Sequence, residues 1–245
     1  MNNVQKHPIV LTFDIENDCG LQSFKGLEIG LPPIIQLLNK YKVPATFFVT
    51  GEVAESFPDL IRAIGRKHEI GCHGYHHESL KTIDSDKVKM LERAKRILQE
   101  LIETPILGYR APYLRVSQTL FITLRKLRFQ YDSSLTYFKF SHWHLKPGLR
   151  EFPTMFPNVI FRFPMGSYLY RIGSLLNNLP VFYFHPWEAI DVRSLFFQKP
   201  HYSWNIFSRP DRWLNSGSHF IKFLSQFIQF HLTHGFQFKA LRDLL

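Results

Sequence analysis

Two histidines four residues apart, His73 and His77 in the segment His73-Gly-Tyr-His-His77, have the spacing of a pair of metal ligands. Imidazoles at positions i and i+4 point the same way on a helical turn and can hold one cation. A zinc-type catalytic site adds a carboxylate or a third histidine and keeps one position for water. The acidic segment with Asp14, Glu16 and Asp18 could supply this carboxylate.

Five ionisable residues each stand just past a separate strand candidate. The strand candidates are short apolar runs at residues 9–13, 45–49, 69–72, 106–109, 129–131 and 181–184. The residues that follow five of them are Asp14, His73, Arg110, Asp132 and His185. Ligands and catalytic groups in parallel α/β folds gather beyond the carboxyl ends of the strands. We therefore expect these five side chains to converge on one mouth.

Strand and helix alternate over the first 135 residues, which is typical of a parallel sheet with helices packed outside. Helices are expected at residues 32–41, 59–67, 87–102 (capped by Asp84 or Ser85), 117–127 and 218–233. Residues 137–180, rich in Phe, Pro, Gly and Trp, predict loops and hairpins, and residues 236–238 a final strand. We expect one domain, residues 1–245, with an α/β fold like a (β/α) barrel.

Charge and composition narrow the class of protein. The chain carries a formal net charge of +10, from 30 Lys and Arg against 20 Asp and Glu, but its basic residues are scattered. No helix-turn-helix, zinc-finger or RNP-like pattern is present, so nucleic acid is not expected as a partner, and an RNA-binding protein is the weakest alternative. An anionic or membrane-linked substrate fits the charge and the 16% aromatic content better.

The cellular compartment is predicted from two features that the sequence lacks. No stretch approaches about 18 uninterrupted apolar residues, and the N-terminal residues show no export pattern. A cytoplasmic location is therefore expected. The two cysteines, Cys19 and Cys72, cannot make a disulfide framework, which agrees with a reducing compartment, and we interpret both as packing residues.

Six ordered blocks resemble the motifs of the polysaccharide deacetylase family, the NodB-homology group of carbohydrate esterases. They are LTFDIEND, ATFFVTGE, EIGCHGYHH, GYRAPY, YDSSL and YFHPWE. The similarity covers roughly residues 8–135 continuously and reappears around residues 181–188. The chain is similar to the branch that holds divergent deacetylases and cyclic-amide hydrolases. The resemblance implies a distorted barrel of about seven or eight strands and one divalent metal ion, with zinc expected, held by a carboxylate and two histidines.

His73 and His77 match the two metal histidines of that family. The usual first motif has two adjacent aspartates, a base and a ligand, but Ile15 occupies the second place here. By analogy with the D-x-E branch, Asp14 would be the base and Glu16 the metal carboxylate. Residues i and i+2 share a face only while a segment stays extended, so Asp18 remains an alternative ligand.

The resemblance also gives roles to four residues in the later blocks. Arg110 matches the arginine that pairs with and orients the catalytic carboxylate. Tyr113 matches the residue whose backbone N–H helps to hold the oxyanion. His185 matches the general acid, and Asp132 the carboxylate that holds that histidine and raises its pKa.

The substrate is predicted less directly. Trp187, with Trp143, Tyr168 and Tyr170, could form a wall for sugar stacking or could simply pack in the core. The Phe-rich helix at 218–233 has the spacing of a core-facing helix, with peripheral membrane contact as the other reading.

The predicted function is removal of an N-acetyl or similar acyl group from an amino sugar in a polysaccharide or its precursor. One alternative is the same chemistry on a cyclic imide, an allantoin-type substrate or an N-carbamoyl amide. A second is a glycan-binding barrel without catalysis.

Overall fold

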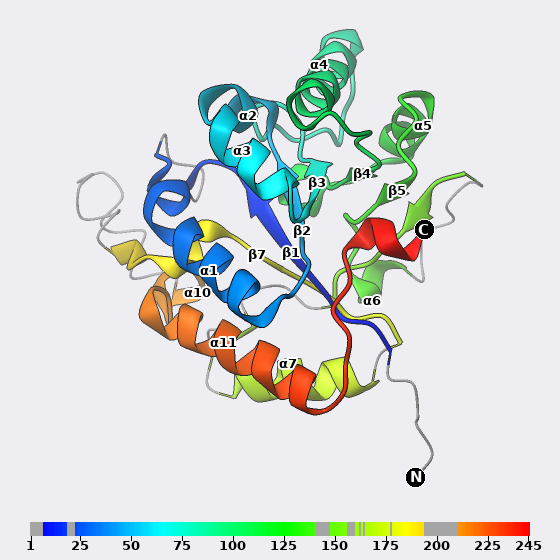
Figure 1. Ribbon diagram of the computed structural model, residues 1–245. Coiled ribbons are helices and arrows are strands. Elements are labelled where there is room, and N and C mark those ends of the chain that lie inside the picture. The colour runs from blue at the N-terminus through cyan, green and yellow to red at the C-terminus, as the bar shows by residue number, and fades with distance from the viewer. Residues whose placement is uncertain are drawn as a thin grey trace.

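Seven short parallel strands form the centre of the computed structural model (Figure 1). The structure describes residues 7–18, 23–140, 148–155, 160–161, 163, 165–176, 178–193 and 210–245. The sheet order is β6-β5-β4-β3-β2-β1-β7. The strands are β1 (Val10–Ile15), β2 (Thr46–Val49), β3 (Glu69–Cys72), β4 (Gly108–Tyr109), β5 (Tyr131–Asp132), β6 (Arg150–Glu151) and β7 (Val181–Phe184).

The sheet is curled, and its two edges come together. Thr154, just after β6, forms a parallel bridge with Val181 of β7, and Met155 N donates to Val181 O over 2.8 Å. Sheets that curl in this way, with helices outside, make the interior a packed core rather than a pore. The predicted distorted barrel of about seven strands is therefore confirmed.

The side chains of β1 alternate between two hydrophobic clusters. Leu11, Phe13 and Ile15 join the large cluster beneath the helices, where the Phe13 ring stacks on Phe47 at 5.1 Å between centroids. Val10 belongs instead to a smaller cluster inside the curl. Because successive side chains of a strand point to opposite faces, the inward set of β1 continues from Val10 through Thr12 to Asp14, and so aims polar groups at the carboxyl end of the curl.

Helices cover the outside of the curled sheet (Figure 1). Caps visible in the sequence define several of their starts, since Thr50 Oγ1 accepts from Val53 N and the Asp84 carboxylate accepts from two backbone N–H groups of the helix that follows it. The α-helices are α1 (Leu31–Tyr41), α2 (Gly51–Ser56), α3 (Pro58–Gly65), α4 (Ser85–Ile102), α5 (Gln118–Lys126), α6 (Tyr137–Phe140), α7 (Gly166–Leu176), α10 (Pro210–Trp213) and α11 (Ser218–Thr233). Shorter turns are η2 (Gly26–Gly30), η3 (Pro112–Leu114), η5 (Pro186–Ala189) and η7 (Leu241–Leu244).

Two expectations from sequence are wrong, and one helix was not expected. The segment at 137–180 contains α6, β6 and α7 in its described part, where loops and hairpins were expected. The Phe, Pro, Gly and Trp content of residues 137–180 favoured loops, although the apolar residues of α7 follow helical spacing. The helix α2 was also missed. The expected strand at 236–238 makes only one isolated bridge, between Ile9 and Phe238.

The Phe-rich helix α11 faces the core, because Phe220, Leu224 and Phe227 are buried. The expected core-facing packing of this helix is therefore confirmed. In the part of the chain that the structure describes, every helix is too short or too polar to cross a bilayer.

The cap of α5 provides a test of the fold. Leu120 N donates to Ser117 Oγ over 3.2 Å, so Ser117→Ala should lower the free energy of unfolding by about 1 kcal/mol. Urea denaturation should show a lower midpoint with an unchanged slope. Ser117→Asp keeps a cap acceptor and is the matched control; an equal loss in both variants would contradict the role of the cap.

Candidate active site

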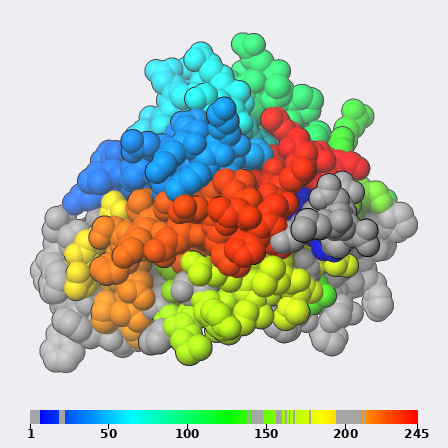
Figure 2. All heavy atoms as spheres, turned by 60° about the horizontal axis from the view of Figure 1, so that its bottom comes forward, coloured from blue at the N-terminus to red at the C-terminus, as the bar shows by residue number. Residues whose placement is uncertain are grey.

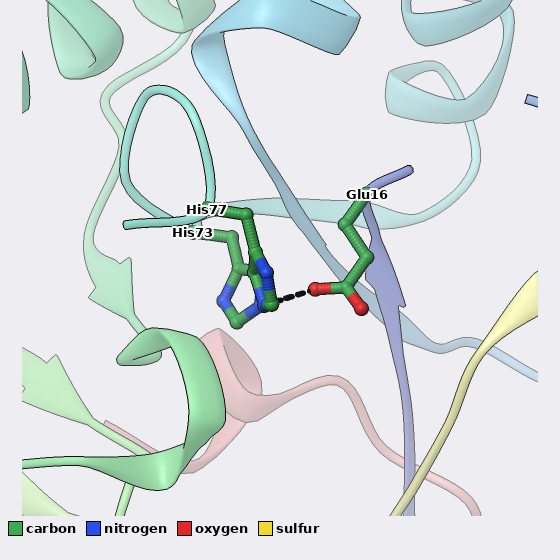
Figure 3. Close-up of side chains that lie close together, drawn as sticks. All are labelled: Glu16, His73 and His77. Carbon is green, nitrogen blue, oxygen red and sulfur yellow. Dashed lines mark ion pairs between the residues drawn. The ribbon is translucent and has the colours of Figure 1, made fainter. Parts of the chain in front are cut away.

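Glu16, His73 and His77 lie together at the carboxyl end of the curl (Figure 3). Their ligand atoms all lie within 4.8 Å of one another. Glu16 Oε2 is 3.3 Å from His73 Nε2 and in close contact with His77 Nε2. Glu16 follows β1 directly, whereas the histidines follow β3, so two strands that are not neighbours supply one cluster.

The two histidines do not lie on a helical turn, which corrects the expectation from their spacing. Residues 73–77 form a loop in which Gly74 has φ +79° and His77 has φ +59°. A positive φ suits glycine and is strained at His77. The loop is held to the start of α2, since Gly51 N donates to Gly74 O over 3.0 Å and Glu52 N to Tyr75 O over 3.1 Å. Tight loop geometry, rather than helical periodicity, brings the imidazoles together.

The donor set suits a divalent cation. His73 Nδ1 lies 2.8 Å from the Arg110 carbonyl oxygen, which can only accept, so Nδ1 carries the proton. In the neutral imidazole, Nε2 then presents its lone pair to Glu16 Oε2. This oxygen is buried and has no hydrogen-bond partner among the described residues. A lone pair on Nε2 that faces a carboxylate oxygen in a buried place is unfavourable unless a proton or a cation lies between the two atoms.

Electrostatics keep Glu16 ionised. Burial alone would raise the pKa of Glu16, but the imidazoles of His73 and His77, with His185 beside them, outweigh it and hold that pKa well below its ordinary value. A carboxylate that stays ionised is a competent metal ligand.

Arg110 fixes the second carboxylate, Asp14. The guanidinium is fully buried, and its Nη1 donates to Asp14 Oδ1 over 2.8 Å and to Thr12 Oγ1 over 2.6 Å. Nε and Nη2 donate to the carbonyl and hydroxyl oxygens of Ser133, each over 2.8 Å. Its plane also lies over the Phe48 ring, 4.3 Å from the centroid. Arg110 thus holds Asp14 in one orientation through Oδ1, and the second oxygen, Oδ2, points away from the guanidinium.

That second oxygen faces His185. His185 Nε2 lies 4.0 Å from Asp14 Oδ2 and 3.8 Å from Glu16 Oε1. On the other side of the ring, Nδ1 lies 3.0 Å from Glu188 Oε1. Burial lowers the pKa of His185, but the Glu188 hydrogen bond and the neighbouring carboxylates outweigh burial, so the pKa is raised overall. An imidazolium is therefore stabilised at this position.

The carboxylate beside His185 Nδ1 is Glu188, so the predicted Asp132–His185 pair is wrong. Asp132 instead accepts from Ser134 Oγ over 2.7 Å and from Ser134 N over 3.1 Å. Ser134 Oγ in turn accepts from Ala111 N. Burial and the charge of Asp132 raise the pKa of Glu151 well above its ordinary value, so Glu151 holds a proton for Asp132. Asp132 therefore orients the chain next to Arg110.

Sequence reasoning overlooked Glu188 although it lies in the quoted block YFHPWE. Pro186 starts the turn η5, and a residue three positions after its cap reaches back to the cap residue. Glu188 Oε1 accordingly also accepts from His185 N over 3.2 Å. The signal was a capping pattern with a histidine at the cap, which is not a usual capping residue.

Tyr113 lies at the rim of the site. Its side chain is 58% exposed, and its ring lies 4.4 Å from that of His77 between centroids. Its φ of +58° turns the backbone sharply after Pro112.

The three described residues of the wall considered for sugar stacking lie in different surroundings. Trp187 is only 7% exposed and stacks on His185 at 5.0 Å between centroids. Tyr170 is fully buried and stacks on Phe182. Tyr168 is exposed on α7, and Trp143 lies outside the described residues.

Asp18 is engaged in loop structure, not with the histidines. Its oxygens accept from Ser23 Oγ and Gly26 N, each over 2.9 Å. Burial raises its pKa to about 6 against the effect of these bonds. A Cβ on Gly26 would come within 2.4 Å of Asp18 Oδ1 and 2.7 Å of Trp187 N, so only glycine fits there.

Cys72 is a buried packing residue, as expected. Burial raises the pKa of its thiol to about 12, so the thiol stays protonated. The other cysteine, Cys19, lies outside the described residues.

Comparison with known proteins agrees with this fold and these motifs. A family model described as Polysaccharide deacetylase matches residues 1–131. A peptidoglycan deacetylase of Helicobacter pylori is 31% identical over 137 residues, which cover 55% of this chain and 46% of that protein. The chain belongs to the polysaccharide deacetylase family. It spans about half or less of the length of the curated relatives it matches.

Solved structures share the fold. A CE4 family pseudoenzyme from Bacillus anthracis superposes with a TM-score of 0.64 at 16% identity, over 98% of this chain and 65% of that chain. A family 4 acetyl xylan esterase from Clostridium thermocellum, solved in complex with a cobalt ion, gives 0.59 at 20% identity, over 96% and 89% of the two chains. At these identities the likeness concerns the fold.

The Arg110–Asp14 pair can be tested by stability. Arg110→Met leaves a buried carboxylate without its counter-charge, and the free energy of unfolding should fall by about 3 to 5 kcal/mol. Urea denaturation of the wild type, Arg110→Met, Asp14→Asn and the double variant gives a double-mutant cycle for the free energy of unfolding. Because Asp14→Asn removes the stranded charge, the double variant should be more stable than Arg110→Met. If the two effects simply add, the proposed coupling is absent.

Proposed function

We propose that the chain is a metal-dependent hydrolase that removes an N-acetyl group from an amino sugar in a polysaccharide or its precursor. The observation that carries this proposal is the pair of carboxylates with separate environments. Glu16 faces two imidazoles, while Asp14 is held by Arg110 and faces His185. Amide hydrolysis needs both an electrophilic centre and groups that move protons.

Glu16, His73 and His77 would hold the cation, and two histidines with one carboxylate leave a coordination position open. A divalent cation at this place, with zinc our expectation, would supply Lewis acidity that activates a water molecule and polarises the acyl oxygen. The cobalt ion in the acetyl xylan esterase structure supports a divalent cation in this fold.

The protein's own groups account for the proton transfers. Asp14 Oδ2 accepts a proton from the attacking water, whose oxygen forms the new bond to the acyl carbon, and Arg110 keeps this carboxylate ionised and oriented. The Tyr113 N–H donates to the oxygen on which negative charge develops. The carbon–nitrogen bond then breaks as the His185 imidazolium gives its proton to the nitrogen, which yields a free amine and acetate.

The substrate class rests on family membership and on the name of the Helicobacter relative, a peptidoglycan deacetylase. An N-acetylated hexosamine is the common unit that these names imply. The predicted cytoplasmic location and single domain remain proposals. A location inside the cell would favour a precursor sugar over the finished polymer.

The direct test is release of acetate. Purified protein loaded with zinc should release acetate from N-acetylglucosamine oligomers, measured by a coupled acetate assay, and should leave hydantoin, allantoin and N-carbamoyl amino acids intact. Turnover of the cyclic or carbamoyl amides alone would assign the same site to those substrates. Absence of turnover on every compound, with zinc bound, would favour the glycan-binding alternative.

Metal content should distinguish the proposed metal ligand His77 from its neighbour His76. His77→Ala removes a ligand and should reduce bound zinc from about one per chain to a small fraction, because catalytic sites use three protein ligands. His76 is the neighbouring residue and is exposed, and its Nδ1 lies 3.6 Å from Glu52 Oε2. His76→Ala is therefore the matched control and should keep its zinc. Elemental analysis after dialysis measures both. Equal metal in the two variants would contradict the assignment.

Glu188 gives a prediction about His185. Glu188→Gln should lower kcat about a hundredfold, which is the smaller end of a general acid's contribution, and should leave KM nearly unchanged because Glu188 lies behind the imidazole. Glu188→Asp keeps the carboxylate on a shorter side chain, so its kcat should lie between those of Glu188→Gln and the wild type. A variant in which KM rises and kcat is kept would mean that Glu188 serves substrate binding instead.

A further inference from the structure

The helix α7 exposes an apolar stripe. Its exposed side chains follow helical spacing, at positions i, i+3, i+4, i+10 and i+11. They are Met165, which directly precedes the helix, at 70%, Tyr168 at 56%, Leu169 at 48%, Leu175 at 54% and Leu176 at 80% exposed. Tyr170 and Ser174, on the other side, are buried. Figure 2 shows α7 at the surface beside α11.

The apolar side of a surface helix normally faces the core. Here one side is covered by α11 and β7, since Tyr170 stacks on Phe182 and lies 5.8 Å from Phe223 between centroids. Among the residues that the structure describes, the outer stripe has no such cover. Contiguous exposed apolar patches of this kind mark interaction sites.

The charge around the stripe selects among partners. From Phe152 to Trp187 the sequence contains no Asp or Glu, and its Lys and Arg residues are Arg162 and Arg171. The whole chain carries +10. An apolar stripe within an acid-free segment of a basic protein is complementary to an anionic lipid surface, which attracts basic proteins and accepts apolar side chains at its boundary.

We propose that α7 docks on the surface of an anionic lipid bilayer. Its 11 residues extend about 16 Å along the axis, so the helix can lie in the interface but cannot span it. Tyr168 has the amphipathic ring that is enriched at headgroup level. This inference does not rest on the proposed hydrolase activity.

A second copy of the chain is a weaker candidate for the stripe. Standard protein interfaces use about 20 to 30 residues a side, whereas five side chains of one helix face are exposed here. Two chains of +10 also repel each other, while an anionic bilayer attracts each of them.

Vesicle sedimentation tests the proposal. The full chain should sediment with vesicles of phosphatidylcholine and phosphatidylglycerol, much less with phosphatidylcholine alone, and less as salt rises. Leu169→Glu/Leu176→Glu should weaken binding at least tenfold while acetate release from soluble oligomers is unchanged. Ile122→Glu, on α5 and 38% exposed, is the matched control and should bind like wild type.

Three outcomes would overturn the proposal. They are a wild-type chain that ignores anionic vesicles, a double variant that binds as well as wild type, and a wild-type dimer that the double variant disrupts in sedimentation velocity. Circular dichroism checks folding. If the double variant is unfolded, Leu176→Glu alone, at the most exposed position of the stripe, replaces it with the same expectation in direction.

Discussion

The ion pair between Arg110 and Asp14 is the interaction on which the rest of the site depends. Both groups are buried, so neither would be tolerated alone. The guanidinium uses Nε, Nη1 and Nη2, and with them it joins β1 to the residues that follow β5. Its backbone carbonyl meanwhile fixes the tautomer of His73. One residue thus orients the proposed base through its side chain and a proposed metal ligand through its main chain.

Several buried carboxyl groups lie close together at this end of the sheet, and each has a different partner. Asp14 has Arg110, Glu16 has two imidazoles, Glu188 has His185, and Asp132 has a protonated Glu151. These pairings prevent like charges from meeting without partners in a buried place. Asp14 and Glu16 both face Nε2 of His185, whereas Glu188 lies against Nδ1 of the same ring.

The parts of this architecture that could be predicted from sequence are those with a local cause. Strands β3 and β7 and helix α11 were predicted at the residues where they occur, because continuous apolar runs and helical spacing define them. The convergence of Asp14, His73 and Arg110 followed from their places after parallel strands. The loop at 73–77 could not be predicted, since it depends on contacts with α2, which are distant in sequence. The partner of His185 was missed because an analogy was followed where a capping turn was present. The helix α7 was missed because the Phe, Pro, Gly and Trp content of residues 137–180 favours loops, although apolar residues follow helical spacing there.

His185 and Glu188 lie on the same short turn, η5, next to β7. A donor and its supporting carboxylate that came from different strands would separate whenever the sheet flexed between them. Here both belong to one rigid unit of a few residues, so any displacement of β7 carries imidazole and carboxylate together. A shift of β7 relative to β1 would therefore change the distance from His185 to Asp14 and Glu16 but leave the dyad itself intact.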